Sequence, residues 1–327
     1  MQVIDVHTHM LNKDWFSLLR AHGGPHYAAG KTKDGRDCVM YDGASFLTPQ
    51  PAHFDYALRI KDMNAAYVDI AIVSLTCPNV FFGGADISTQ AARLVNDDMA
   101  AAHTAYPDRI RWLASIPWEY PALAIEELKR ARENGAVGVM VLANINGRSL
   151  TETAFEPVWD AIDALGLPVL VHPTSPAGAS LMDLITHNMT GSVGFMFDTS
   201  LAIGRMIFDG FFERYRKLKI IASHGGGALP YIVGRLDRCY DMEPARRTKI
   251  SRLPSEYLRQ VYFDSVVYRQ DALQLCLDVA GASNLMYGSD YPHAIGDMRG
   301  CLARVDSLKA DYVGRIRGEN ARRIFGL

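Results

Sequence analysis

Cysteine pairs are missing from this chain. Its five cysteines are odd in number and lie far apart, and no two of them form a CxxC pair. The pattern therefore excludes a disulfide framework and a cysteine-based zinc site. The cysteines are Cys38, Cys77, Cys239, Cys276 and Cys301.

Long apolar runs and a surplus of charge of either sign are also missing. No apolar run approaches the ~20 residues that a membrane span needs. The formal net charge is −2 and the isoelectric point is near 6.5, which favours neither nucleic acid nor an anionic membrane as a partner. The first residues contain no basic segment followed by an apolar one, so no secretory signal is visible. We therefore expect a cytoplasmic protein that binds neither nucleic acid nor membranes.

The sequence does contain a repeated alternation of short apolar runs with longer amphipathic segments. Hydrophobic residues make up 49% of the chain and charged residues 21%, so a large core can form. Such alternation is typical of βα units around a parallel sheet. The expected strands cover residues 3–9, 70–75, 110–116, 138–142, 169–172, 218–223, 261–264 and 285–288. The expected helices cover residues 56–67, 89–106, 121–134, 155–165, 196–215, 229–242 and 272–280.

Eight strands with interleaved helices favour a closed (β/α)8 TIM barrel over an open doubly wound sheet. We therefore expect one domain over residues 1–327, a normal size for such a barrel. Residues 10–55 do not fit a plain barrel: they carry the turn signals Asp34-Gly35 and Asp42-Gly43 around a strand-like run, which predicts a small β insertion after strand 1. Residues 173–194 form a second irregular segment, and both segments lie on the face where barrel active sites occur.

The sharpest chemical signal is the pair His7 and His9 at the end of the first expected strand. Residues i and i+2 of a strand point the same way, so both imidazoles can aim at one point in the barrel mouth. Two convergent imidazoles form half of a transition-metal site. Taken alone, the same pattern also fits two ordinary solvated histidines.

Three more titratable residues end apolar runs that we expect to be strands. They are His172, His224 and Asp290, and the C-terminal strand ends are where catalytic groups of a barrel lie. Their spacing places them on strands five, six and eight. Because strands eight and one are neighbours in a closed barrel, Asp290 can lie beside the first two histidines. The alternative is a set of unrelated strand-end residues.

Several motifs along the chain belong together as a family signature. They are residues 5–9, 58–63, 171–173, 223–227 with Gly234-Arg235, 288–292 and 318–321. With these motifs the chain resembles the amidohydrolase superfamily. More narrowly, it resembles the branch that contains aminocarboxymuconate-semialdehyde, resorcylate and carboxyvanillate decarboxylases and related hydrolases. The resemblance covers essentially the whole chain.

The resemblance implies one divalent metal ion, with zinc expected and manganese as the alternative. The residues that match the family's metal ligands are His7, His9, His172 and Asp290. His224 matches the catalytic histidine, and Asp290 would ligate the metal and take part in proton transfer.

Two arginines match the family's carboxylate-binding arginines, one from each subunit of a dimer. They are Arg59 and Arg235. The resemblance thus implies a small anionic carboxylate substrate and a homodimer or a higher homo-oligomer.

The chain departs from the decarboxylase pattern at two places. Thr174-Ser175 follows His172-Pro173 where aminocarboxymuconate-semialdehyde decarboxylase has Trp-Asp, and His293 stands where that enzyme has Phe. Both changes make the pocket more polar, and we expect His293 to contact substrate unless it is an ordinary loop histidine. The other histidines have no patterned context, and we expect them to be structural or solvent-facing; they are His22, His26, His53, His103 and His187.

The predicted function is non-oxidative decarboxylation of an unsaturated or aromatic carboxylic acid, of the aminocarboxymuconate-semialdehyde or hydroxybenzoate type. The alternatives are a metal-dependent hydrolase of C–N, ester or C–C bonds and a catalytically inactive binding barrel. Trp118 and the pair Phe81-Phe82 follow strands, so each could stack on an aromatic substrate or simply pack in the core.

Overall fold

Eight parallel strands form the centre of the molecule in a computed structural model that describes residues 2–184 and 186–327. Their hydrogen-bonded order is β1-β5-β6-β7-β10-β11-β12-β13, which is also their order along the chain. The strands are β1 (Ile4–His9), β5 (Ile70–Ser74), β6 (Ile110–Ala114), β7 (Gly138–Leu142), β10 (Val169–His172), β11 (Ile220–Ala222), β12 (Tyr262–Asp264) and β13 (Leu285–Met286). All eight predicted strands are present, and several begin one or two residues later or end one or two residues earlier than expected.

Backbone hydrogen bonds join the last strand to the first. Val6 N donates to Tyr287 O at 3.0 Å, and His9 N donates to Tyr291 O at 2.7 Å. Thr8 and Tyr291 form a parallel bridge. The predicted TIM barrel is therefore confirmed, and the first and eighth strands are neighbours as the site prediction requires.

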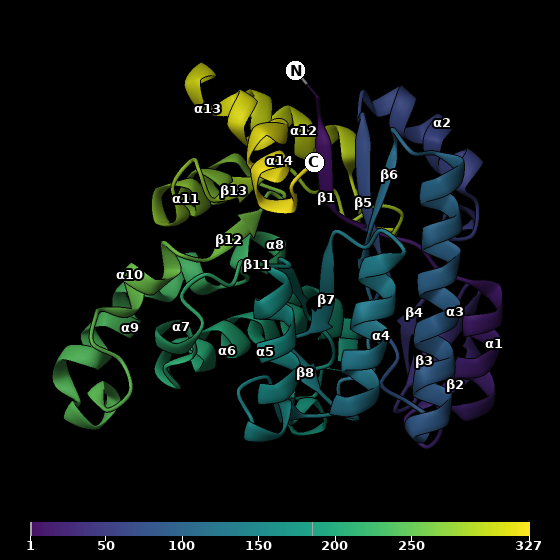
Figure 1. Cartoon of the computed structure of the whole chain (residues 1–327), viewed down its shortest axis with the longest axis horizontal. Helices are drawn as coiled ribbons and strands as arrows, with labels where there is room; N and C mark the ends of the chain where they lie inside the picture. The colour runs from purple at the N-terminus through teal and green to yellow at the C-terminus, as the bar shows by residue number, and fades with distance from the viewer. Residues whose placement is uncertain (1, 185) are drawn as a thin grey trace.

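Helices cover the outside of the strands (Figure 1). Those that match the prediction are α2 (Tyr56–Ala66), α3 (Gly84–Ala105), α4 (Pro121–Glu133), α5 (Glu156–Leu165), α9 (Leu229–Met242) and α11 (Gln270–Ala280). The helix expected over residues 196–215 is two helices, α6 (Phe195–Phe208) and α7 (Phe211–Arg214). The break falls at Gly210, whose φ of 78° lies in the left-handed region that an α-helix cannot continue through.

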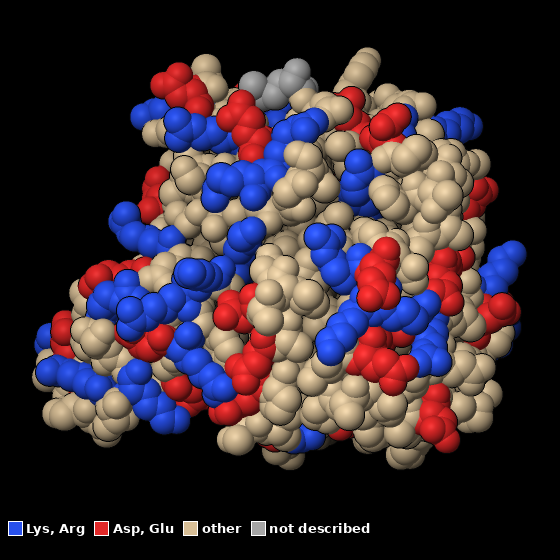
Figure 2. Space-filling view, viewed as in Figure 1, with Lys and Arg blue, Asp and Glu red and all other residues tan. Residues whose placement is uncertain are grey.

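The remaining helices were not expected from the sequence. They are α1 (Lys13–His22), α8 (Ser223–Gly226), α10 (Pro254–Leu258), α12 (Met298–Asp306), α13 (Ala310–Gly314) and α14 (Asn320–Phe325). Among the described residues, no helix is long and apolar enough to cross a membrane. Figure 2 shows acidic and basic side chains interspersed over one face, without a large field of one sign.

The insertion after β1 combines a helix with a small antiparallel sheet. Its strands are β2 (Tyr27–Lys31), β3 (Asp37–Tyr41) and β4 (Ala44–Leu47), paired in that order. The predicted β insertion is thus confirmed, whereas α1 was missed. Trp15 and Leu19 of α1 are buried one helical turn apart, and Asn12 caps the helix by accepting from Asp14 N and Trp15 N.

Arg59 of α2 is buried against the seam between the first and last strands. Its Nη1 donates to Thr8 Oγ1 at 2.5 Å, and its Nη2 donates to His9 O. Thr8 Oγ1 donates in turn to Tyr291 O at 2.8 Å, and the guanidinium carbon lies 4.8 Å from the centre of the Tyr291 ring. The arginine therefore ties the end of β1 to the residue that follows Asp290.

Replacing Arg59 with alanine is expected to lower the free energy of unfolding by about 3 kcal/mol or more, because buried acceptors lose charged donors. Urea unfolding followed by circular dichroism measures the change. Lys61→Ala on the exposed face of the same helix is the control, with an expected effect of about 0.5 kcal/mol or less. An Arg59→Ala protein of unchanged stability that only binds substrate more weakly would instead support the sequence-based role of Arg59.

Candidate metal centre and adjoining cavity

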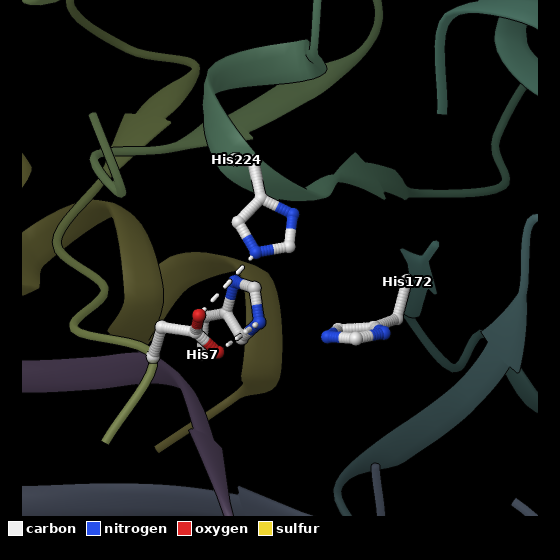
Figure 3. Close-up of side chains that lie close together, drawn as sticks. His7, His172 and His224 are labelled. Atoms are coloured by element: carbon white, nitrogen blue, oxygen red, sulfur yellow. Dashed lines mark ion pairs between the residues drawn. The ribbon is translucent and has the colours of Figure 1, made fainter. Parts of the chain in front are cut away.

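The five predicted site residues meet at the C-terminal end of the barrel. Potential ligand atoms of His7, His172, His224 and Asp290 all lie within 4.8 Å of one another. His9 Nε2 lies 3.1 Å from His7 Nε2 and 3.2 Å from Asp290 Oδ1. Figure 3 shows the rings of His172, at the end of β10, and of His224, on α8 after β11, directed toward His7. Residues up to 283 positions apart thus form one cluster.

Three of the imidazoles form a hydrogen bond through Nδ1, on the side of the ring that faces away from the centre of the cluster. His7 Nδ1 lies 2.6 Å from Asp264 Oδ2, His172 Nδ1 lies 2.8 Å from Pro173 O, and His9 Nδ1 lies 3.3 Å from Ser74 Oγ. Such partners fix ring orientation and leave Nε2 free to bind a metal ion. His224 differs, because its buried Nδ1 has no hydrogen-bond partner among the described residues.

Asp264 was not singled out from the sequence, although it ends a predicted strand. Besides His7 Nδ1, its carboxylate accepts from His224 N and Gly225 N, both at 2.9 Å. His224 has a φ of 55°, a left-handed conformation that costs free energy in a residue with a side chain and that occurs often at functional sites. The two backbone hydrogen bonds to Asp264 stabilise this conformation and so set the direction of the His224 ring.

Burial and mutual contacts keep the cluster in the protonation states of metal ligands. Burial lowers the pKa of His9 to about 3, and burial together with the neighbouring histidines holds the pKa of His172 well below its usual value. Burial opposes ionisation of Asp290, but hydrogen bonding to His224 and His9 outweighs it and lowers the pKa of Asp290 well below its usual range. Neutral imidazoles beside an ionised carboxylate are what a divalent cation binds.

His7 has the opposite shift. Burial disfavours its charged form, but the charge of Asp264 outweighs burial, so the pKa of His7 is raised. The interaction that raises this pKa is the contact of Nδ1 with Asp264. It lies on the side of the ring away from the centre of the cluster, so Nε2 stays available to a metal ion.

The donor set fits a divalent transition metal. Asp290 Oδ1 is buried and faces His9 Nε2 at 3.2 Å and His7 Nε2 at 3.5 Å without a well-formed hydrogen bond from either, and such a buried carboxylate oxygen is costly unless a cation binds it. Three imidazole nitrogens and a carboxylate oxygen suit zinc or manganese. The geometry alone does not distinguish the two.

Two further histidines lie beside the cluster, one of them unexpected. The ring centre of His293 is 4.9 Å from that of His9, and His293 Nε2 is 3.1 Å from Thr76 Oγ1. The structure thus brings His293 to the site. His53 was expected to be structural or solvent-facing; it is fully buried, with its ring centre 4.9 Å from that of His293. Its place in an insertion, outside the strand ends, left no sequence signal.

A cavity of ≈ 570 Å³ lies near the C-terminal ends of β7 and β10; its lining includes Leu142, the sheet neighbour of His172, but none of the clustered histidines. The insertion, the segments after β5 and β7, and the segment after β10 line it. Phe81 and Phe82 are part of the lining, as an aromatic substrate would require. Trp118 is not: it is fully buried, and its ring centre lies 4.8 Å from that of Trp159, so it packs in the core.

The two predicted carboxylate-binding arginines do not line this cavity. Arg59 is fully buried where β1 meets the last strand, and its guanidinium donates hydrogen bonds to Thr8 and His9 of β1. Arg235 lies on α9 and is exposed. Within one chain, the described residues therefore do not bring either guanidinium into the cavity.

A TIM barrel with histidines and an aspartate clustered at its mouth defines a metal-dependent barrel enzyme. Comparison with known proteins narrows this class: residues 4–327 match the family model described as amidohydrolase. The chain belongs to the amidohydrolase family, as its motifs predicted.

Several relatives and solved structures are similar over nearly the whole chain. The 2-amino-3-carboxymuconate-6-semialdehyde decarboxylase of Dictyostelium discoideum is 30% identical over 305 residues, which cover 90% of this chain and 83% of the relative. The 5-carboxyvanillate decarboxylase of Sphingomonas paucimobilis has a TM-score of 0.86 at 27% identity, covering 100% of this chain and 99% of that one. The 5-carboxyvanillate decarboxylase of Novosphingobium aromaticivorans, complexed with manganese and 4-hydroxy-3-methoxy-5-nitrobenzoic acid, has a TM-score of 0.83 at 25% identity, covering 100% and 96%. The predicted class, a metal-dependent carboxy-lyase of this family, is confirmed.

Asp264→Ala is expected to weaken binding of Mn²⁺ or Zn²⁺ by about 10- to 100-fold, because His7 loses the partner that orients it. Calorimetric titration of metal-free protein measures the affinity. Asp271→Ala is the matched control, since the Asp271 carboxylate pairs with Arg269 on an exposed surface. Equal affinities in both variants would show that the Asp264 carboxylate does not support the metal centre.

Proposed function

We propose that this enzyme releases CO2 from a small aromatic or unsaturated carboxylic acid at the cluster of His7, His9, His172, His224 and Asp290. The observation that carries the proposal is the meeting of these five residues at one point of the barrel mouth, beside a cavity with aromatic walls. Substrates of the hydroxybenzoate and aminocarboxymuconate-semialdehyde types are the candidates, in line with the names of the relatives. A cytoplasmic location remains a prediction of the sequence.

Four residues would hold one divalent ion: His7, His9, His172 and Asp290. The supporting observation is that each of the three imidazoles is fixed through Nδ1 and presents Nε2. Zinc is the ion expected from the sequence, and manganese is the ion in the Novosphingobium structure. When bound, such an ion acts as a Lewis acid toward oxygen atoms of the substrate.

His224 would move the proton that decarboxylation requires. When the bond between the ring carbon and the carboxylate breaks, that carbon must gain a proton. His224 Nε2 lies 3.6 Å from Asp290 Oδ2, at the edge of the ligand cluster, and its other nitrogen is not tied to a partner. The imidazole can therefore pass a proton between Nε2, the Asp290 carboxylate and the substrate carbon.

Arg235 would bind a substrate carboxylate in the site of a neighbouring subunit. It lies exposed on α9, on which Tyr231 is 85% exposed, and exposed Phe197 and Leu201 lie on α6. The two helices are in contact, because Ala228 N donates to Ser200 Oγ at 2.8 Å. Exposed apolar side chains around an arginine are typical of a subunit interface, which supports a homodimer.

Hydrolysis of a C–N, ester or C–C bond was the alternative that the sequence left open, and the named relatives, which are decarboxylases, favour CO2 release over it. The same ligand cluster suits activation of water, and CO2 release separates the two functions.

His224→Ala should reduce turnover by about 10²-fold or more while leaving metal content unchanged, as expected for an acid–base group. CO2 release from hydroxybenzoates and elemental analysis provide the two measurements. His22→Ala, on the exposed end of α1, is the control. Full turnover in the His224→Ala enzyme would make His224 a structural residue.

Mixing two inactive variants tests whether Arg235 acts across subunits. In a mixed dimer of His224→Ala and Arg235→Ala chains, the second chain keeps its own His224 and receives Arg235 from its partner. Activity should therefore return on mixing if Arg235 acts in the partner's site. If Arg235 serves its own subunit, every site lacks one group and the mixture stays inactive, even with mixed dimers shown to form by mass spectrometry.

A further inference from the structure

Two short segments of chain connect residues at the metal centre with residues that line the cavity. Thr76 contacts His293 through Oγ1, and Pro78, two residues later, lines the cavity. His172 belongs to the cluster, and Thr174, two residues later, also lines the cavity. These segments bring the cavity close to the cluster, so a substrate whose reacting carboxylate lies at the cluster can extend its far side toward the cavity. At ≈ 570 Å³ the space falls within the ~300–1,000 Å³ of sites for drug-sized ligands.

The walls are aromatic on one side and carry hydroxyl groups on another. Phe81 and Phe82 contribute apolar surface, and the insertion contributes Tyr27 and Tyr41. The segment after β10 contributes Thr174 and Ser175, and the buried Ser175 hydroxyl has no hydrogen-bond partner among the described residues. A planar ring bearing hydrogen-bonding substituents matches such a lining.

Positive charge is lacking in this part of the described chain. No lysine or arginine lines the cavity, and its two ionisable groups other than the tyrosines are His26 and Asp42, which pair with each other at 2.9 Å on the exposed rim. Behind the wall, the buried Asp198 carboxylate accepts from Thr174 N at 2.9 Å and from Asn144 Nδ2 at 2.8 Å. Its hydrogen-bond donors are neutral, burial raises its pKa to about 7, and the positive charge that acts on it is that of Arg205, which does not line the cavity.

We propose that this cavity is the distal part of the substrate site, that it accepts an uncharged substituent with hydrogen-bonding groups, and that it discriminates against a second carboxylate. The inference rests on the proposed decarboxylase function and narrows its substrate class. An anion placed near the Asp42 carboxylate, in a lining without lysine or arginine, would lose hydration without gaining a cation. A hydroxyl, ether or carboxamide loses less on transfer and can pair with the phenols and hydroxyls.

An isosteric pair of acids tests the charge preference. 2-Hydroxyterephthalate and its 4-carboxamide differ at the distal position in charge and hardly in shape. With manganese-loaded enzyme, kcat/KM for CO2 release should be at least about 10-fold higher for the carboxamide, since unpaired like charges are strongly disfavoured. Equilibrium binding of both acids to the His224→Ala protein should show the same order. Equal binding, or a preference for the dicarboxylate, overturns the inference.

Two cavity variants and one control make the test specific. Ser175→Lys supplies the missing cation and should reverse the preference, whereas Ser192→Lys, exposed in the same region and outside the cavity lining, should leave it unchanged. Tyr41→Phe should weaken carboxamide binding by about fivefold, the usual effect of one lost hydrogen bond, without affecting plain 2-hydroxybenzoate. This milder variant decides the question if Ser175→Lys does not fold.

The failure of this inference differs from the failure of the proposed function. If no acid releases CO2 while binding still favours the carboxamide and responds to Ser175→Lys, the decarboxylase proposal fails and the cavity assignment stands. If CO2 is released equally from both acids, the decarboxylase proposal stands and the cavity assignment fails.

Discussion

The buried carboxylate of Asp264 accepts four hydrogen bonds, and the rest of the metal centre depends on them. Its donors are His7 Nδ1, His224 N, Gly225 N and Val266 N, at 2.6 to 3.0 Å. One group thus orients an imidazole from β1 and the backbone after β11. Gly288 makes this contact possible, because a Cβ there would lie 3.0 Å from the Cβ of His7. A larger residue would push the strands apart at the point where they converge.

Strand ends were the part of the site that could be predicted from the sequence. His7, His9, His172 and Asp290 each end an apolar run, and the closed order of the strands brings them together. The site residues could be predicted in this way because side-chain direction in a strand follows from sequence position, and because active sites of barrels lie at the C-terminal strand ends. The eight strands were predictable for the same reason: each is buried on nearly every residue.

The direction of side chains in helices and in the insertion could not be predicted. A motif identified Arg59, but the packing of α2 against the barrel seam directs its guanidinium toward β1 instead of the cavity. His53 lies in an insertion whose path over the mouth depends on tertiary contacts, so its burial against His293 gave no local pattern. Helix α1 was missed because turn signals later in the insertion suggested strands throughout, although its buried residues follow a helical spacing.

The metal centre and the cavity draw on different parts of the chain. Ligands come from strand ends in the barrel, whereas Tyr27, Tyr41 and Asp42 of the cavity come from the antiparallel insertion. The antiparallel sheet of the insertion carries neither a candidate metal ligand nor His53, so its loops can vary in length and composition with little effect on the ion or the proton-transfer groups. Natural drift in this one segment is therefore a route by which the same catalytic apparatus could be retargeted to new acids, and it is the region to randomise first when new selectivity is sought.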